Sequence, residues 1–164
     1  MDPIKEALTF DDVTLAPKFS SVLPSEVNTS VKLSKNLKLK IPLLSSAMDT
    51  VTESKMAIEI AKAGGIGVIH RNLSINDQIL EIKKVQKKGL AVGAAVGTND
   101  TEISRAEKII KSKVDLIVVD TAHGHTKRVA NIIKFIKKKN QAKQPCVQAT
   151  LQQLRLQNFY VNLE

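Results

Sequence analysis

The chain has 164 residues, 43% of them hydrophobic and 25% charged, a balance that suits one globular unit and excludes fibrous and disordered classes. No segment approaches the roughly 18 consecutive apolar residues of a membrane span, and the N-terminus lacks the basic-then-apolar order of a signal peptide. The single cysteine, Cys146, excludes an internal disulfide framework. We therefore expect a cytoplasmic protein with no membrane partner.

The formal net charge of +9 would suit nucleic acid, an anionic membrane surface or phosphorylated small molecules. Many lysines fall near the ends of two predicted helices, where they complement the helix dipole: Lys83, Lys84, Lys87, Lys88, Lys134, Lys137, Lys138 and Lys139. Only 3% of the residues are aromatic, so side chains that stack on bases are scarce. We expect solvated helix ends and no nucleic-acid partner.

Residues 1–40 show no sustained periodicity, and their prolines predict extended segments and turns that wrap on a larger body. A regular pattern begins with a predicted strand over 41–46. The next helix is predicted near 52–63, with Thr50 and Glu53 as its capping box. A second strand is expected to follow at once.

Alternation of strands and helices then continues to about residue 140. Strands are predicted over 66–70, 90–96 and 114–119. Ser74 with Asp77, and Asn99 with Glu102, mark the starts of two helices. Apolar residues recur on one face of each of the last three helices: Ile75, Ile79, Ile82 and Val85; Ile103, Ala106, Ile109 and Ile110; Val129, Ile132, Ile133 and Ile136.

This alternation predicts an α/β fold with right-handed parallel crossovers, which either a doubly wound sheet or a β/α barrel satisfies. The glycines do not favour a nucleotide-binding Rossmann unit. Gly64, Gly65 and Gly67 precede or lie within a strand, whereas the phosphate fingerprint follows a strand and opens a helix.

In parallel α/β folds the chemistry lies beyond the carboxyl ends of the strands. Those ends carry the candidate site residues Ser45, Ser46, Met48, Asp49, His70, Arg71, Asn72, Gly97, Asp120, Thr121, His123 and His125. Arg71 with the hydroxyls of Ser45 and Ser46 would suit a phosphate. Asp120 would suit a ribose diol.

Each of these residues also has a structural alternative, such as helix capping by Ser46 or Thr121, or a hydrogen-bonded place at the rim for His70. His123 and His125 lie two residues apart, but no third ligand of matching type is spaced nearby. We therefore expect no metal site.

Five segments resemble, in order, the N-terminal half of inosine monophosphate dehydrogenase. They are Leu8–Asp12, Ser45–Glu53, Gly64–Asn72, Val92–Val96 and Val118–His125. The resemblance covers residues 4 to about 140. It implies the first half, about four βα units, of a TIM (β/α)8 barrel, in a family that assembles as a homotetramer.

By this resemblance, the substrate-binding residues are Ser46, Met48 and Arg71, and the NAD-binding residues are Asp120, Thr121 and His123. The reaction implied is the NAD-dependent oxidation of inosine monophosphate to xanthosine monophosphate. In it, a cysteine attacks purine C2, hydride passes to NAD and water releases the product. Guanosine monophosphate reductase shares the barrel and the first motif, so a reductase-like fragment is an alternative.

Several features that the resemblance leads us to expect are missing. Only Gln86–Gly89 stands where the family usually carries its regulatory cystathionine-synthase-like (CBS) modules. The catalytic cysteine loop, the potassium-binding turns and the mobile flap have no counterpart, and Cys146 lies outside any such context, so no catalytic residue is assigned. We expect a truncated enzyme that is inactive by itself, or alternatively a noncatalytic fragment that binds nucleotide or a partner.

The tail over 141–164 is foreign to the family pattern. It holds six of the eight glutamines, and we predict that it lacks the fifth strand. The codons of Val147 to Phe159, displaced by two bases, permit Ala-Gly-Asn-Val-Ala-Thr-Ala-Glu-Ala-Thr-Lys-Leu, which resembles the next family motif. We therefore expect a frameshift, which the coding DNA tests.

Overall fold

The computed structural model of the chain describes residues 8–140 and 146–148. The strands of its main sheet are β3 (Leu44–Ser45), β4 (Ile66–Ile69), β5 (Val92–Val96), β6 (Leu116–Val119) and β7 (Cys146–Gln148). The helices are α1 (Ser54–Lys62), α2 (Ile75–Gln86), α3 (Thr101–Lys111) and α4 (Lys127–Asn140). The predicted sequence of strand-helix units is therefore confirmed. None of the described helices is long and apolar enough to cross a membrane.

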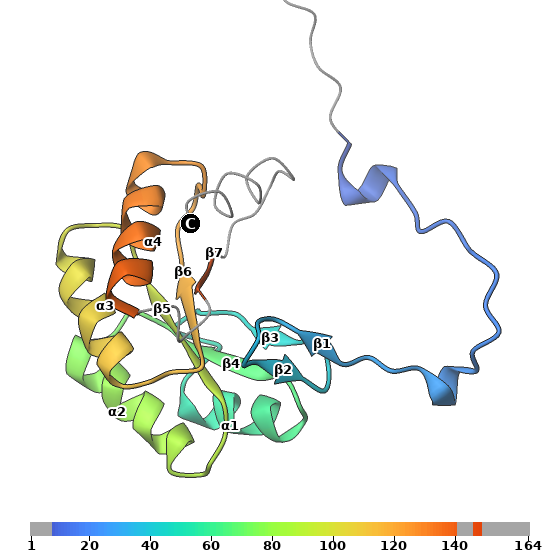
Figure 1. Cartoon of the computed structure of the whole chain (residues 1–164), viewed down its shortest axis with the longest axis horizontal. Coiled ribbons are helices and arrows are strands. Elements are labelled where there is room, and N and C mark those ends of the chain that lie inside the picture. Colours follow the sequence, from blue (N-terminus) through green and yellow to red (C-terminus); the bar gives the residue numbers. More distant parts are fainter. Residues whose placement is uncertain (1–7, 141–145, 149–164) are drawn as a thin grey trace, which may run out of the picture.

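The main sheet is parallel, and its strand order β3-β4-β5-β6-β7 follows the order of the chain. Figure 1 shows the four helices along one face of this sheet. In a doubly wound fold the strand order reverses and helices cover both faces. In the described part of the chain the strand order does not reverse and the helices lie on one face. The doubly wound alternative is therefore wrong for this part of the chain.

The two faces of the sheet have separate apolar cores, because successive residues of a strand point to opposite sides. The helix-facing core includes Ile69, Val92, Val96, Ile117 and Val119 of the strands with Ile82, Ile109 and Ile136 of the helices. On the other face, Leu116 and Val118 pack with Leu37 and Leu39. These two leucines belong to a small antiparallel hairpin formed by β1 (Val31–Lys32) and β2 (Lys38–Leu39).

The helix starts agree only partly with the predicted caps. Ser74 caps α2 as predicted, because its hydroxyl accepts the Asp77 N–H at 3.1 Å. The capping box at α1 is wrong: Glu53 makes no side-chain cap bond, and Glu81 of α2 accepts the Ser54 N–H at 2.8 Å instead. At α3 the predicted Glu102 does not cap its own helix, since its carboxylate accepts the Gly97 N–H.

The N-terminal segment before the hairpin extends away from the sheet and helices (Figure 1). Extended chain and turns were predicted there, but wrapping on a larger body was not correct for residues 8–27. Leu15 and Phe19 are 94% and 96% exposed. The bonds that shape the segment are local, such as that from the Thr9 N–H to the Asp12 carboxylate at 2.9 Å.

The fifth strand that we predicted to be missing from the tail is present. β7 pairs in parallel with β6, with Cys146 opposite Ile117 and Gln148 opposite Val119. The unpaired edge of β6 offers backbone donors and acceptors that a returning chain can satisfy, whatever its side chains. The rest of the tail, and with it most of the frameshift hypothesis, lies outside the described residues.

Candidate functional site

The turn after β3 presents the first group of candidate residues. Ser46 and Met48 are exposed, and Met48 shows 54% of its surface to solvent. A hydrogen bond holds the backbone of the turn, because the Thr52 hydroxyl donates to the Ser46 carbonyl at 2.5 Å. The backbone of this turn is thus held, while the side chains of Ser46 and Met48 remain available to a ligand.

A hydrogen bond joins this turn to the next one in the sheet. The side-chain amide of Asn72 donates to the Asp49 carboxylate at 2.9 Å, which links two neighbouring strand-helix units. The structure therefore brings together two residues that the sequence placed at the same edge. It does so through the turns, so the polar rim is continuous from β3 to β4.

His70, at the end of β4, is only 2% exposed. Its Nδ1 accepts the Asn72 N–H at 3.1 Å, and its Nε2 lies 3.6 Å from a Glu53 carboxylate oxygen. The structural alternative fits His70 better than a ligand role, because the ring shapes the β4–α2 turn from a buried position.

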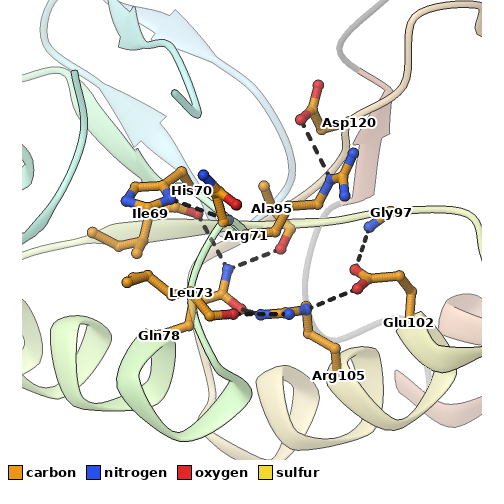
Figure 2. Close-up of polar contacts among 11 residues, drawn as sticks. Ile69, His70, Arg71, Leu73, Gln78, Ala95, Gly97, Glu102, Arg105 and Asp120 are labelled. Atoms are coloured by element: carbon orange, nitrogen blue, oxygen red, sulfur yellow. Dashed lines mark hydrogen bonds and ion pairs between the residues drawn. The ribbon is translucent and has the colours of Figure 1, made fainter. Parts of the chain in front are cut away.

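Arg71 and Asp120 meet across the end of β5. The Arg71 Nε lies 3.5 Å from an Asp120 carboxylate oxygen, and both side chains are more than a third exposed. Figure 2 shows the guanidinium between Gly97 and Asp120. A Cβ on Gly97 would lie 3.2 Å from Arg71 Nη1, so the absence of a side chain at Gly97 leaves room for this crossing.

The sequence grouped Arg71 with the hydroxyls of Ser45 and Ser46 for a phosphate, and that grouping stays a prediction. The ion pair with Asp120 is a contact that the sequence did not indicate. An exposed pair of this kind contributes at most about 1 kcal/mol to folding. Both charged groups can therefore exchange partners with a ligand at little cost to the fold.

The loop between β6 and α4 carries the remaining candidates. Thr121 is half-buried, while His123 and His125 are exposed. The capping role considered for Thr121 belongs to Thr126, whose hydroxyl accepts the Val129 N–H at 3.2 Å. Within residues 8–140, no three histidine, cysteine or acidic side chains gather as metal ligands.

Sequence reasoning missed the buried place of three polar residues beneath this rim, Gln78, Glu102 and Arg105, and considered Glu102 only as the mark of a helix start. All three are buried, although Gln78 shares the apolar face of α2 with Ile82 and Val85. A long polar side chain on an otherwise apolar helix face is the signal that could have found them. They connect the helices to the strand ends that carry Arg71 and Gly97 (Figure 2).

Fold and site together define a parallel strand-helix protein with a polar rim at the carboxyl ends of its strands. Residues 7–150 match the family model described as IMP dehydrogenase / GMP reductase domain. The chain therefore belongs to the IMP dehydrogenase / GMP reductase family.

Curated relatives agree with this family. The chain is 43% identical over 185 residues to an inosine-5'-monophosphate dehydrogenase of Borreliella burgdorferi, an alignment that covers 82% of this chain and 46% of that protein. It is 39% identical over 179 residues to the enzyme of Cryptosporidium parvum, with 83% and 44% covered. A shorter match to the Staphylococcus saprophyticus enzyme reaches 60% identity over 83 residues. The chain spans less than half the length of these relatives.

Proposed function

We propose that this chain is the nucleotide-binding part of an IMP dehydrogenase, and that the rim at the strand ends holds inosine monophosphate and NAD. The observation that carries the proposal is the convergence of three strand ends, where Arg71 crosses Gly97 to reach Asp120. Such a convergence at the carboxyl edge of a parallel sheet is where ligands bind in this class of fold.

A half barrel is the architecture that we propose for these units. Each strand of the main sheet pairs with the next strand of the chain, and the four helices lie on the same face of that sheet (Figure 1). Both features support the proposal. Successive units of a (β/α)8 barrel have the same arrangement. The hairpin β1–β2 would then close one end of the barrel interior, where Leu37 and Leu39 pack on the sheet.

The rim residues fit a purine nucleotide and NAD in separate places. Ser46 and Met48 lie exposed on the β3–α1 turn and would contact the monophosphate substrate. Asp120, with Thr121 and His123 beside it, would hold the cofactor, since a partly exposed carboxylate can accept both hydroxyls of a ribose. NAD, when bound, supplies the hydride acceptor of the family reaction.

Arg71 fits the cofactor side of the rim better than the substrate side, because its charged group already lies beside Asp120. We propose that it moves to a phosphate oxygen of the cofactor or stays to orient the Asp120 carboxylate. Arginine suits both tasks, since its planar group forms paired bonds to either kind of oxygen.

We further propose that the 164-residue chain binds these ligands without turning them over. Cys146 begins β7 and pairs with Ile117, which places it toward the amino ends of the strands, away from the rim. No other cysteine is present to attack purine C2.

The test is to purify the chain, titrate it with inosine monophosphate and with NAD, and follow NADH formation. Saturable binding without NADH is expected. Steady turnover would overturn the noncatalytic part of the proposal, and the absence of saturable binding by either ligand would overturn the whole.

A reductase-like fragment is the second candidate, because the matched family model covers both enzymes. Parallel titrations with inosine and guanosine monophosphates discriminate the two. Tighter binding of the guanosine compound would favour the reductase.

A further inference from the structure

We propose that Gln78, Glu102 and Arg105 are positioning residues, which hold the ends of β4 and β5 so that Arg71 lies over Gly97 beside Asp120. This inference rests on the proposed nucleotide-binding role of the rim. It assigns a task to three buried polar side chains that bond to one another and to the backbone of the strand ends and of Leu73.

Arg105 is the centre of the network. Its Nε donates to Glu102 Oε1 at 3.0 Å, its Nη1 to Gln78 Oε1 at 2.9 Å and its Nη2 to the Leu73 carbonyl at 3.0 Å. Each of its three nitrogens thus has an acceptor, two of them on α2 or the turn before it. Arg105 lies in α3, so the network ties α3 to the preceding unit.

Two further bonds carry the network to the strands. Glu102 Oε2 accepts the Gly97 N–H at 2.6 Å. The Gln78 side-chain amide donates to the Ala95 carbonyl at 2.9 Å and to the Ile69 carbonyl at 3.3 Å. Figure 2 shows these contacts directly below the Arg71–Asp120 pair.

The β4–α2 turn is consequently held at both of its ends. Gln78 bonds the Ile69 carbonyl before the turn, and Arg105 bonds the Leu73 carbonyl after it. Arg71 lies between these two anchors. Its backbone therefore has little freedom to move relative to β5.

Gly97 transmits the position of Glu102 to Arg71 by close packing. A Cβ at Gly97 would lie 3.0 Å from Glu102 Cγ and 3.2 Å from Arg71 Nη1. Both side chains therefore pack around the place that a Gly97 side chain would occupy. A shift of Glu102 would change the space in which the guanidinium lies.

A contribution to stability alone is a poor explanation for this network. A buried ion pair such as Glu102–Arg105 adds little to folding compared with apolar side chains of similar size. The helix-facing core next to the network is apolar. The three polar side chains lie beneath the strand ends, where a site needs a fixed backbone.

The test compares three substitutions in α3 of the full chain. Glu102→Gln keeps the size of the side chain but replaces one acceptor oxygen by a donor, so it loses its bond to Gly97 or to Arg105. Glu107→Gln is the matched control on the same helix, where Glu107 pairs with Lys139 at 3.2 Å on the outside. Ile109→Val, a small truncation of a fully buried side chain, is the control for lost stability.

Two quantities are measured for each variant: the hydrogen-exchange rate of the Gly97 amide and the dissociation constant for NAD. In Glu102→Gln we expect both to rise about tenfold, the change that accompanies loss of one hydrogen bond to a charged group. Glu107→Gln should change neither. Ile109→Val should lower the melting temperature and leave NAD binding as it was.

If Ile109→Val lowers the melting temperature as much as Glu102→Gln does and also weakens NAD binding as much, the role of Glu102 is merely structural and the inference is overturned. Unchanged exchange at Gly97 in Glu102→Gln would overturn it as well. If Glu102→Gln does not fold, Arg105→Lys replaces it, because lysine keeps the charge but cannot reach the three acceptors at once.

Failure of the proposed function has a different signature. If the unsubstituted chain binds no NAD, the rim does not hold this cofactor, and the proposed function fails. The exchange rate of the Gly97 amide and the NMR signal of the Arg71 Nε–H still decide the inference, since both report the backbone and guanidinium positions without any ligand.

Discussion

Gly67 shows how one missing side chain lets a helix lie against a strand. A Cβ at this position of β4 would lie 2.3 Å from the Ala57 Cα and 2.5 Å from its Cβ. Ala57 is fully buried in α1. The two small residues together set how closely the first helix approaches the sheet, and with it the turn that carries Ser46 and Met48.

Replacing Gly67 by alanine should therefore destabilise the chain. The added methyl meets backbone atoms that cannot turn aside, and we expect a loss of about 3 kcal/mol in the free energy of unfolding. Gly93→Ala is the control, because its added Cβ would meet the movable Val68 Cγ2 at 3.1 Å. Urea unfolding measures both, and an equal loss in the two variants would contradict this account of the α1–β4 contact.

Glu81 gives the fold a dependence on pH. Burial raises the pKa of its carboxyl, but bonds from the Lys84 ammonium and from Ser54 outweigh this and lower the pKa below its usual 4.5. The folded state therefore binds its proton more weakly than the unfolded chain. The resulting stabilisation is present above about pH 4.5 and is lost as the pH falls through the lowered pKa.

Glu81→Ala should flatten this acid dependence. The variant also loses the acceptor for the Ser54 N–H at the start of α1, so we expect a loss of about 1 kcal/mol near neutral pH. Unfolding free energies measured between pH 3 and pH 7, for the variant and the unsubstituted chain, test the prediction. Parallel curves for the two proteins would show that Glu81 is not the titrating group.

At the scale of elements, the periodicity of apolar residues predicted the strand-helix units and their order. The partners of the polar residues could not be predicted in the same way, because they lie far apart in the chain. Arg105 bonds Gln78 and Leu73, which are 27 and 32 residues away. Glu81 caps a helix 27 residues before it. The local cap pattern therefore indicated Glu53 for a bond that Glu81 of α2 completes.

The contacts within the candidate site were also only partly predictable, because its residues lie far apart in the chain. The carboxyl-end rule brought Arg71, Asp120 and Gly97 to one edge, as the structure has them. It could not say which side chains touch, because neighbouring strand ends differ in height and turn shape. The ion pair of Arg71 with Asp120 depends on Gly97, because a side chain there would crowd the guanidinium.

The apolar stripe of α2 should account for much of its attachment to the sheet. Ile82 is fully buried in the helix-facing core, so Ile82→Ala should cost about 2–5 kcal/mol of unfolding free energy. Leu80→Ala is the control on the same helix, since Leu80 is 55% exposed. A loss of similar size in both variants, measured by urea unfolding, would mean that the stripe has been assigned to the wrong face.

On the scale of the whole molecule, the described sheet is open rather than closed. β3 and β7 are its outer strands. An edge strand offers unpaired backbone groups to another chain. The exposed apolar residues of the N-terminal segment add to this, so we expect the protein to form concentration-dependent assemblies.

Leu44→Lys should reduce this association. A lysine on an edge strand disfavours pairing with another edge, and Leu44 is partly exposed on β3. Leu80→Lys places the same charge on the outside of α2 and should leave association unchanged. Sedimentation velocity over a range of concentrations measures this, and equal effects of both lysines would point to net charge rather than the strand edge.

The location of bound nucleotide tests the central claim most directly. Backbone amide NMR of the full chain, titrated with inosine monophosphate and then with NAD, would report it. We predict that the monophosphate shifts the amides of Ser46 and Met48, and that NAD shifts those of Gly97, Asp120 and Thr121, each to saturation. Saturable shifts confined to other parts of the chain, or none at all, would contradict the assignment of the rim.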